Sequence, residues 1–345
     1  MSALAWRRIR TPRDRVSFRV HGRTAVVCAA LLLAVLAVGV VSVGTGDYPL
    51  SPEQVIATLL GRGDPASAFI VETLRLPRVL TGLLVGGAFG IAGAVFQSVS
   101  RNPLGSPDII GFTTGSATGA LVVILVAGGT ALQIGLGAVA GGFATAAVVY
   151  LLALRHGVQG YRLVLVGIGV SAVLESVNAY LITRAARDDA FAAAHWLVGS
   201  LNGRGWEHVW PVGTALAVLV PAALALSRRL TILELGDDAA RALGVPAEGS
   251  RLALLLVAVG LTAVGTASTG PVVFVALAAP QLARRLTRAA APGLASSALM
   301  GALLLAASDL VAQRVVSADL PVGVVTGAVG GAYLGWLLWR GWRTT

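Results

Sequence analysis

Residues 72–120 read ETLRLPRVLTGLLVGGAFGIAGAVFQSVSRNPLGSPDIIGFTTGSATGA. Arg75 and Arg78 stand three residues apart, so a helical start places them on one face. The apolar run that follows carries a glycine at every fourth position, at 82, 86 and 90. In a membrane helix this spacing clears one face of side chains, so that a neighbouring backbone can approach closely. Prolines and glycines between 103 and 107 then force a turn before a second apolar segment, which begins at Ile109. The stretch therefore predicts a packed pair of membrane helices.

The composition predicts the same environment for the whole chain. Of its 345 residues 56% are apolar and 12% charged, with a mean hydropathy of +0.82, whereas a soluble domain is about a quarter charged. At about 20 residues per span the length accommodates about ten helices. The net charge of +10 comes from arginines beside apolar runs, which is typical of membrane topology signals and not of nucleic-acid binding. We expect an all-α, polytopic membrane protein.

Several kinds of chemistry are excluded by residues that the sequence lacks. All 26 basic residues are arginine, so neither a P-loop lysine nor a Schiff-base lysine is available. Cys28 is the single cysteine, and the four histidines are scattered without an H-E-x-x-H pattern. We therefore expect no catalytic residue and no metal site.

The distribution of arginine predicts the topology. Seven arginines stand against one Asp14 in residues 1–23, which indicates a cytoplasmic N-terminal segment before an uncleaved first helix at 24–43. Ser51-Pro52 suggests a short helix start in the following loop. The chain from 24 to 343 is predicted to form one transmembrane domain, with further spans at about 77–100, 109–127, 132–154, 161–183, 209–226, 251–266, 270–286, 294–316 and 322–339.

This folding puts nineteen arginines on the cytoplasmic side and seven outside, so both termini are predicted to be cytoplasmic and the number of spans even. Ten spans are expected. Eight remain the alternative if the segment near Pro271 is re-entrant and another run fails to span.

Two carboxylates fall within predicted spans, where charge is costly and faces protein or water. Glu175 forms a polar stripe with Ser171 and Asn178 at helical spacing. Asp309 is expected to pair with Gln313 or Arg314, about one turn on.

A third candidate is the loop that begins at Arg229 and reads RLTILELGDDAARALGVP. Gly236 interrupts the stretch that begins at Arg229, and Asp237 is predicted to cap a short helix after it. Arg241 lies near the end of that helix, and Gly244 supplies a left-handed stop. From these residues alone, a solvated connecting helix remains the simplest interpretation.

Taken in order, the motifs R-L-P-R, G-A-x-F-Q and R-N-P-L-G-S-P-D-x-x-G-F resemble the permease subunits of bacterial ABC importers for iron–siderophore complexes and vitamin B12. The ferric-enterobactin type is the most similar, and the resemblance covers nearly the whole chain. A later stretch, Gly270-Pro271 to Arg285, is similar to the family's G-P-x-x-F-x-x-L-x-A-P-H-x-A-R, with Gln281 in place of the histidine.

The resemblance implies a type II ABC importer permease fold and assigns roles to the candidates. The loop at about 228–250 would couple to an ATPase subunit through Leu235, Gly236, Asp237, Asp238, Ala240, Arg241 and Gly244. An external binding protein would dock on Arg75, Arg78 and Arg314. Ser171, Glu175 and Asn178 would line the translocation path.

The implied assembly lies in the bacterial plasma (inner) membrane. It contains a second permease subunit, identical or homologous, two ATPase subunits and an extracytoplasmic siderophore-binding protein, and its cargo is a ferric siderophore. No cofactor is expected on this chain, since ATP and Mg²⁺ would be held by the ATPase.

Two other classes of function are weighed against this one. An ion-coupled secondary transporter would use Glu175 and Asp309 as coupling carboxylates. An intramembrane enzyme would need a paired nucleophile and base, and the sequence offers no such pair. The requirement for a separate ATPase distinguishes the importer from the secondary transporter.

Overall fold

The computed structural model describes residues 6–10, 17–154, 160–315 and 320–342. Parts of the predicted cytoplasmic segment 1–23 lie outside the described residues, as do Arg155, His156 and Arg343.

The described chain is helical apart from one short hairpin. The hairpin pairs β1 (Trp6–Arg10) antiparallel with β2 (Ser17–His21). The helices are α1 (Gly22–Gly44), α2 (Pro52–Leu59), α3 (Pro65–Ala68), α4 (Leu76–Ser100), α5 (Phe112–Val122), α6 (Ala131–Ala153), α7 (Gly160–Arg184), α8 (Arg187–Leu197), α9 (Trp206–Glu234), α10 (Asp237–Ala242), α11 (Ala247–Thr269), α12 (Val275–Thr287), α13 (Leu294–Val315) and α14 (Val322–Trp342). Two π-helical turns, Phe69–Arg75 and Val123–Ala127, lead into α4 and extend α5.

Each of the ten predicted spans corresponds to a helix, and the all-α membrane fold is confirmed. Within the described residues, seven helices are long and apolar enough to cross a membrane: α1, α4, α6, α7, α9, α11 and α13. The apolar helices at Phe112–Ala127 and Val322–Tyr333 are shorter, and α12, which has Pro280 inside it, is 13 residues long.

The predicted helix boundaries are closest where a proline or a capping residue marks the end of a helix. Helix α4 was expected from Pro77 and begins one residue earlier. Ser51 caps α2 with a reciprocal pair of hydrogen bonds to Gln54, at 2.8 and 3.2 Å. The prediction that the sixth span ends near Leu226 is wrong, because α9 continues as one helix to Glu234.

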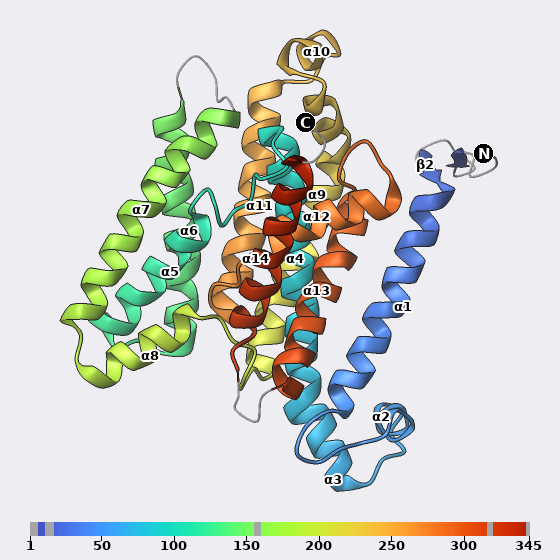
Figure 1. The fold of residues 1–345 in the computed structure, drawn as a ribbon, viewed down its shortest axis with the longest axis vertical. Coiled ribbons are helices and arrows are strands. Elements are labelled where there is room, and N and C mark those ends of the chain that lie inside the picture. Colours follow the sequence, from blue (N-terminus) through green and yellow to red (C-terminus); the bar gives the residue numbers. More distant parts are fainter. Residues whose placement is uncertain (1–5, 11–16, 155–159, 316–319, 343–345) are drawn as a thin grey trace.

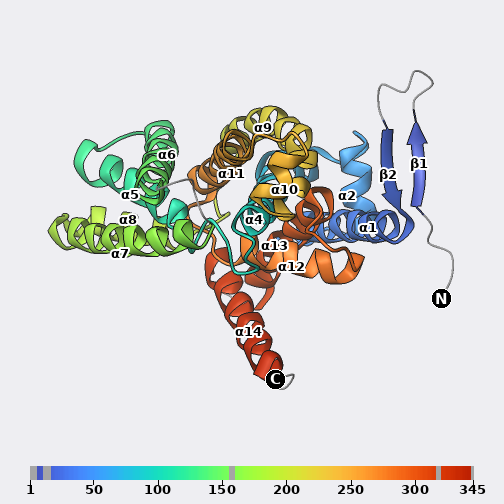
Figure 2. The same ribbon diagram turned by 90° about the horizontal axis from the view of Figure 1, so that it is seen from above.

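Helix α4 lies at the centre of the bundle, packed against α13, α11, α9 and α12 (Figure 1). Helices α5 to α8 form a group at one side, and α1 with its hairpin lies at the other (Figure 2). The glycine stripe of α4 brings a neighbouring helix close, as predicted. A methyl group added at Gly86 or Gly90 would collide with the backbone of α13, at Gly301 and Ser297 respectively, so these glycines permit the close packing.

The two ends of the bundle carry different elements. Helix α10, the start of α1 and the end of α14 lie at one end, called the α10 end below, and α2 and α3 lie at the opposite end (Figure 1).

Candidate functional site

The short helix α10 is bracketed by two glycines with positive φ, Gly236 at 113° and Gly244 at 76°. The predicted left-handed stop at Gly244 is therefore confirmed. Asp237 and Asp238 occupy the first turn and Arg241 the last, an arrangement that suits the helix dipole. The predicted capping role of Asp237 is wrong, since Gly236 is the N-cap residue and no described side chain caps this helix.

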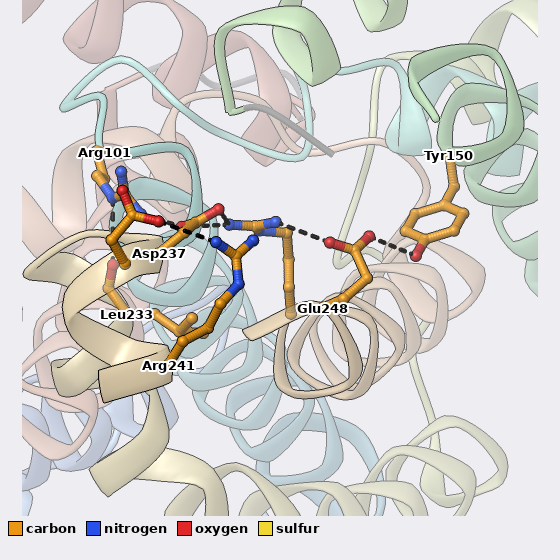
Figure 3. Close-up of polar contacts among 8 residues, drawn as sticks. Arg101, Tyr150, Leu233, Asp237, Arg241 and Glu248 are labelled. Atoms are coloured by element: carbon orange, nitrogen blue, oxygen red, sulfur yellow. Dashed lines mark hydrogen bonds and ion pairs between the residues drawn. The ribbon is translucent and has the colours of Figure 1, made fainter. Parts of the chain in front are cut away.

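The carboxylate of Asp237 is instead held by two arginines (Figure 3). Its two oxygens accept hydrogen bonds from Nη2 of Arg251 at 2.8 and 2.9 Å, and Nη2 of Arg101 donates to it as well. Partial burial favours a higher pKa for Asp237, but the hydrogen bonds and charges of Arg251 and then Arg101 outweigh it and hold the pKa below its ordinary value. Since only 4% of the Arg251 side chain is exposed, Asp237 compensates a buried positive charge.

The same arginines extend the network to neighbouring helices (Figure 3). Arg101 Nε donates to the carbonyl oxygen of Leu233 at 3.2 Å. Arg251 Nη1 donates to one oxygen of Glu248 at 3.2 Å, and the hydroxyl of Tyr150 donates to the other at 3.0 Å. Helix α10 is thereby connected, through Asp237, to the ends of α4, α6, α9 and α11.

The sequence did not identify four members of this network: Arg101, Tyr150, Glu248 and Arg251. Glu248 and Arg251 stand three residues apart on one turn of α11, and this spacing was an available signal. Arg101 was assigned only to a turn, and it is 136 residues from Asp237 along the chain. No local pattern connects positions so far apart.

The outward side of this region is exposed. Leu235 and Leu243 are 67% and 61% exposed, whereas Ala240 is fully buried. Asp238 and Arg241 form an ion pair of 2.9 Å on the surface. The coupling residues predicted from sequence thus include an inner support, the half-buried Asp237 and the buried Ala240, and an exposed face that combines apolar and charged groups. Protein partners cover faces of this kind.

The arginines predicted to dock a binding protein lie at the end opposite α10, and they make contacts within the chain. Arg75 donates to the carbonyl oxygens of Val43 at 3.0 Å and Tyr48 at 2.8 Å. Arg314 donates to the hydroxyl of Thr45 at 3.1 Å. These bonds hold the end of α1 and the loop that follows it.

Arg78 is the ion-pair partner of Asp309, at 2.8 and 3.1 Å through two of its nitrogens. Asp309 is 2% exposed and also accepts a bond from Gln313 at 2.7 Å. The prediction that Asp309 pairs with Gln313 or Arg314 is therefore confirmed for Gln313. The side chain of Arg314 contacts Thr45 instead. The charge of Asp309 is compensated inside the protein, as a buried carboxylate requires.

The predicted polar stripe lies on α7, beside α5. The hydroxyl of Ser171 is hydrogen-bonded to that of Thr114 on α5, at 3.1 Å. Glu175 and Asn178 line a hollow of about 470 Å³ between the two helices, together with Asp108. The hollow therefore includes two of the three stripe residues, Glu175 and Asn178, and it adds Asp108, which the sequence placed only in a turn.

Gln281, which occupies the position of the family's histidine, connects two helices. Its side-chain amide donates to the Gln97 side chain on α4 and, at 3.4 Å, to the carbonyl oxygen of Pro103. Gln97 in turn donates to the carbonyl oxygen of Leu277 on α12, at 3.0 Å. A neutral amide pair thus joins α4 and α12 at this point.

The membrane-length helices packed around α4, with the braced α10 at one end, define the chain as a polytopic membrane protein. The sequence model of the FecCD transport family matches residues 32–340. The chain therefore belongs to the FecCD transport family.

Individual relatives agree with this assignment. The chain is 45% identical to the ferric enterobactin transport system permease protein FepG of Escherichia coli, over 91% of this chain and 96% of that protein. It is 36% identical to the achromobactin transport system permease protein CbrC of Dickeya dadantii, over 97% and 96%. An inward-facing structure of a metal-chelate type ABC transporter superposes with a TM-score of 0.83 at 29% identity, covering 92% of this chain and 99% of that one.

The chain is thus the permease of an ABC importer for iron siderophores or iron chelates, with the type II importer fold.

Proposed function

We propose that the cargo is a ferric siderophore of the catecholate, enterobactin-like class and that it crosses the bacterial plasma (inner) membrane by alternating access. The similarity to FepG, whose name specifies ferric enterobactin, supports this class. The chain would act beside a second permease subunit, identical or homologous, with two ATPase subunits that hold ATP and Mg²⁺.

The observation that carries the proposal is the way α10 is mounted. Its exposed face, formed by Leu235, Asp238, Arg241 and Leu243, is the surface that docks on the ATPase subunit. Asp237 ties the other side of the helix to Arg101 and Arg251. Movement imposed on α10 by the closing ATPase would therefore pass directly to α4 and α11.

The position of α10 also determines the proposed orientation of the chain in the membrane. The ATPase is cytoplasmic, so the α10 end faces the cytoplasm, and the start of α1 and the end of α14 lie there with it (Figure 1). The arginine bias of the sequence supports this orientation independently.

The opposite end would then receive the extracytoplasmic binding protein. Arg75 and Arg78 hold the end of α1 and Asp309 respectively, so they shape the docking surface. Arg314, the more exposed of the three arginines, offers it a charge. Cargo released there would pass between the two permease subunits along the face of α7 that carries Ser171, Glu175 and Asn178.

The test has two arms. Purification of the chain from its native membrane, in mild detergent, should yield an ATP-binding cassette ATPase and a second permease subunit, and the absence of any ATPase would contradict the coupling role of α10. Cells that lack other iron importers should take up a ferric catecholate in preference to ferric citrate when they produce the complete transporter. Uptake of ferric citrate alone would contradict the cargo class.

A further inference from the structure

A groove of about 410 Å³ lies between α6 and α9, and α11 packs against both of these helices (Figure 2). Its lining comes from residues 131–139 of α6, 207–211 of α9 and 264–268 of α11. Most of these residues are apolar, and the hydroxyl of Ser268 is bonded within its own helix to the carbonyl oxygen of Val264, at 3.0 Å. Glu207 and His208, at the start of α9, are the ionisable residues of the described lining.

The groove is about as deep as one leaflet of a membrane. Its lining on α6 runs from Ala131 to Val139, a length of about 12 Å along the helix, against about 15 Å for half of the hydrocarbon core. Further along, the two helices converge on α11. A methyl group added at Gly260 would lie 3.2 Å from Leu219 of α9 and 3.6 Å from Phe143 of α6. This shape suits an acyl chain and not a helix that crosses the whole membrane.

The mouth of the groove lies at the depth of lipid head groups. The indole N–H of Trp206 donates to the carbonyl oxygen of Glu72 at 3.0 Å, in the segment that joins α3 to α4. Trp210, one turn further along α9, is 66% exposed. Tryptophan is enriched at the interfaces between membrane and water. Glu207 and His208 therefore stand where head groups lie, at the end of the bundle opposite α10.

Two opposite charges flank the ring of His208 at this mouth. Nη1 of Arg204 lies 2.9 Å from its Nε2, and Oε1 of Glu207 lies 3.3 Å from its Nδ1. Arg204 is half-buried, whereas the Glu207 side chain is 68% exposed. Pro211, which also lines the groove, has no N–H to bond the carbonyl oxygen of Glu207 one turn before it. A head group with a primary ammonium and a phosphate complements this arrangement, because it offers donors to Glu207 and an anion to Arg204.

We propose that the groove binds one molecule of phosphatidylethanolamine, with an acyl chain along α6 and α11, its ammonium on Glu207 and its phosphate toward Arg204. An acyl chain gains no hydrophobic free energy by leaving the bilayer, so the head group and the fit of the chain decide which lipid stays. The bound lipid joins α6 to α9 at this end of the bundle. The site does not depend on the cargo, and the proposed orientation assigns the lipid to the outer leaflet.

Native mass spectrometry of the full chain tests the head group. The chain is purified in mild detergent, stripped of lipid and titrated with phosphatidylethanolamine or phosphatidylglycerol of identical acyl chains. One phosphatidylethanolamine should bind about fivefold more tightly than phosphatidylglycerol, as expected for a partly exposed charge pair. Glu207→Gln should remove this preference. Equal affinity for the two lipids in the native chain, or an unchanged preference in Glu207→Gln, would overturn the site.

A second pair of variants tests the fit of the acyl chain. A Cβ added at Gly135, which lines the groove, meets one described atom within 4 Å, the Cβ of Ala267 at 4.0 Å, so Gly135→Leu extends into the groove. Gly213 is the matched control, because it lies on α9 outside the lining and a Cβ there meets no described atom within 4 Å.

Gly135→Leu should weaken binding of phosphatidylethanolamine by about tenfold, the cost of overfilling a packed space, and Gly213→Leu should leave it unchanged. Equal binding by the two variants would mean annular lipid only and would overturn the site. Since Glu207→Gln changes an exposed side chain and leaves the packing intact, the head-group test decides the matter if Gly135→Leu does not fold.

Discussion

Replacing Asp237 with asparagine tests the support of α10 most sharply, because it removes one negative charge from between two guanidinium groups at almost constant size. Two hydrogen bonds from Arg251 and one from Arg101 depend on that carboxylate. Hydrogen bonds to charged groups are worth about 1.5–3 kcal/mol each where water is excluded. One third of the Asp237 side chain is exposed, at 33%, and Arg251 keeps Glu248 at 3.2 Å. These two features reduce the expected loss to about 2 kcal/mol in the local stability of α10.

Amide hydrogen exchange measures this loss directly. The N–H of Ala240 is bonded to Gly236 and that of Leu243 to Ala239, at 2.9 and 3.0 Å. A loss of about 2 kcal/mol corresponds to roughly 30-fold lower protection of such amides. The neighbouring change Asp238→Asn is the matched control, because Asp238 occupies the same first turn and its carboxylate makes only a surface ion pair, with Arg241.

Exposed pairs of that kind contribute little to stability, so Asp238→Asn should change protection by no more than about twofold. If Asp237→Asn lowers protection no more than Asp238→Asn does, the two arginines do not hold α10 and the reasoning is refuted.

Three further predictions concern the two ends of the bundle. Because the pKa of Asp237 is lowered in the folded chain, its stabilisation of α10 is fully present above the ordinary aspartate range of about pH 4 and is lost as the pH falls below it; exchange protection should follow this course in the native chain and not in Asp237→Asn. Combined replacement of Asp238 and Arg241 by alanine should abolish uptake while leaving membrane insertion intact, and normal uptake with normal ATPase copurification would contradict the docking role. Arg314→Glu should weaken association with the binding protein, most clearly at low ionic strength where surface charges are least screened, and an unchanged affinity there would show that Arg314 only contacts Thr45.

The sequence was most informative about features that depend on neighbouring residues. Apolar run length, glycine spacing and proline positions identified α4 to within one residue of its start. Gly236 and Gly244 marked α10 because a change of backbone direction needs only the local residue type. The extension of α9 was missed because Arg228 and Arg229 were interpreted as a loop, although arginines also continue a helix into the polar region beyond the membrane.

The connections between distant segments were beyond the reach of such patterns. The pairs Arg101–Asp237 and Arg78–Asp309 join residues 136 and 231 positions apart. Periodicity indicates which face of a helix is polar, but it does not say which of several arginines will reach a given carboxylate. The sequence therefore located the short helix α10 and the polar face of α7, whereas their partners became visible only in the packed structure.

The measurement that tests the central claim most directly is uptake of radioactive iron, supplied as a ferric catecholate with the binding protein, by proteoliposomes that contain the two permease and two ATPase subunits. With ATP on the side of the α10 end, uptake should proceed, should continue after a protonophore has collapsed the proton gradient, and should stop when the ATPase subunits are omitted. Uptake that stops with the protonophore while ATP remains high, or that proceeds without the ATPase subunits, would contradict ATP-driven import through this chain.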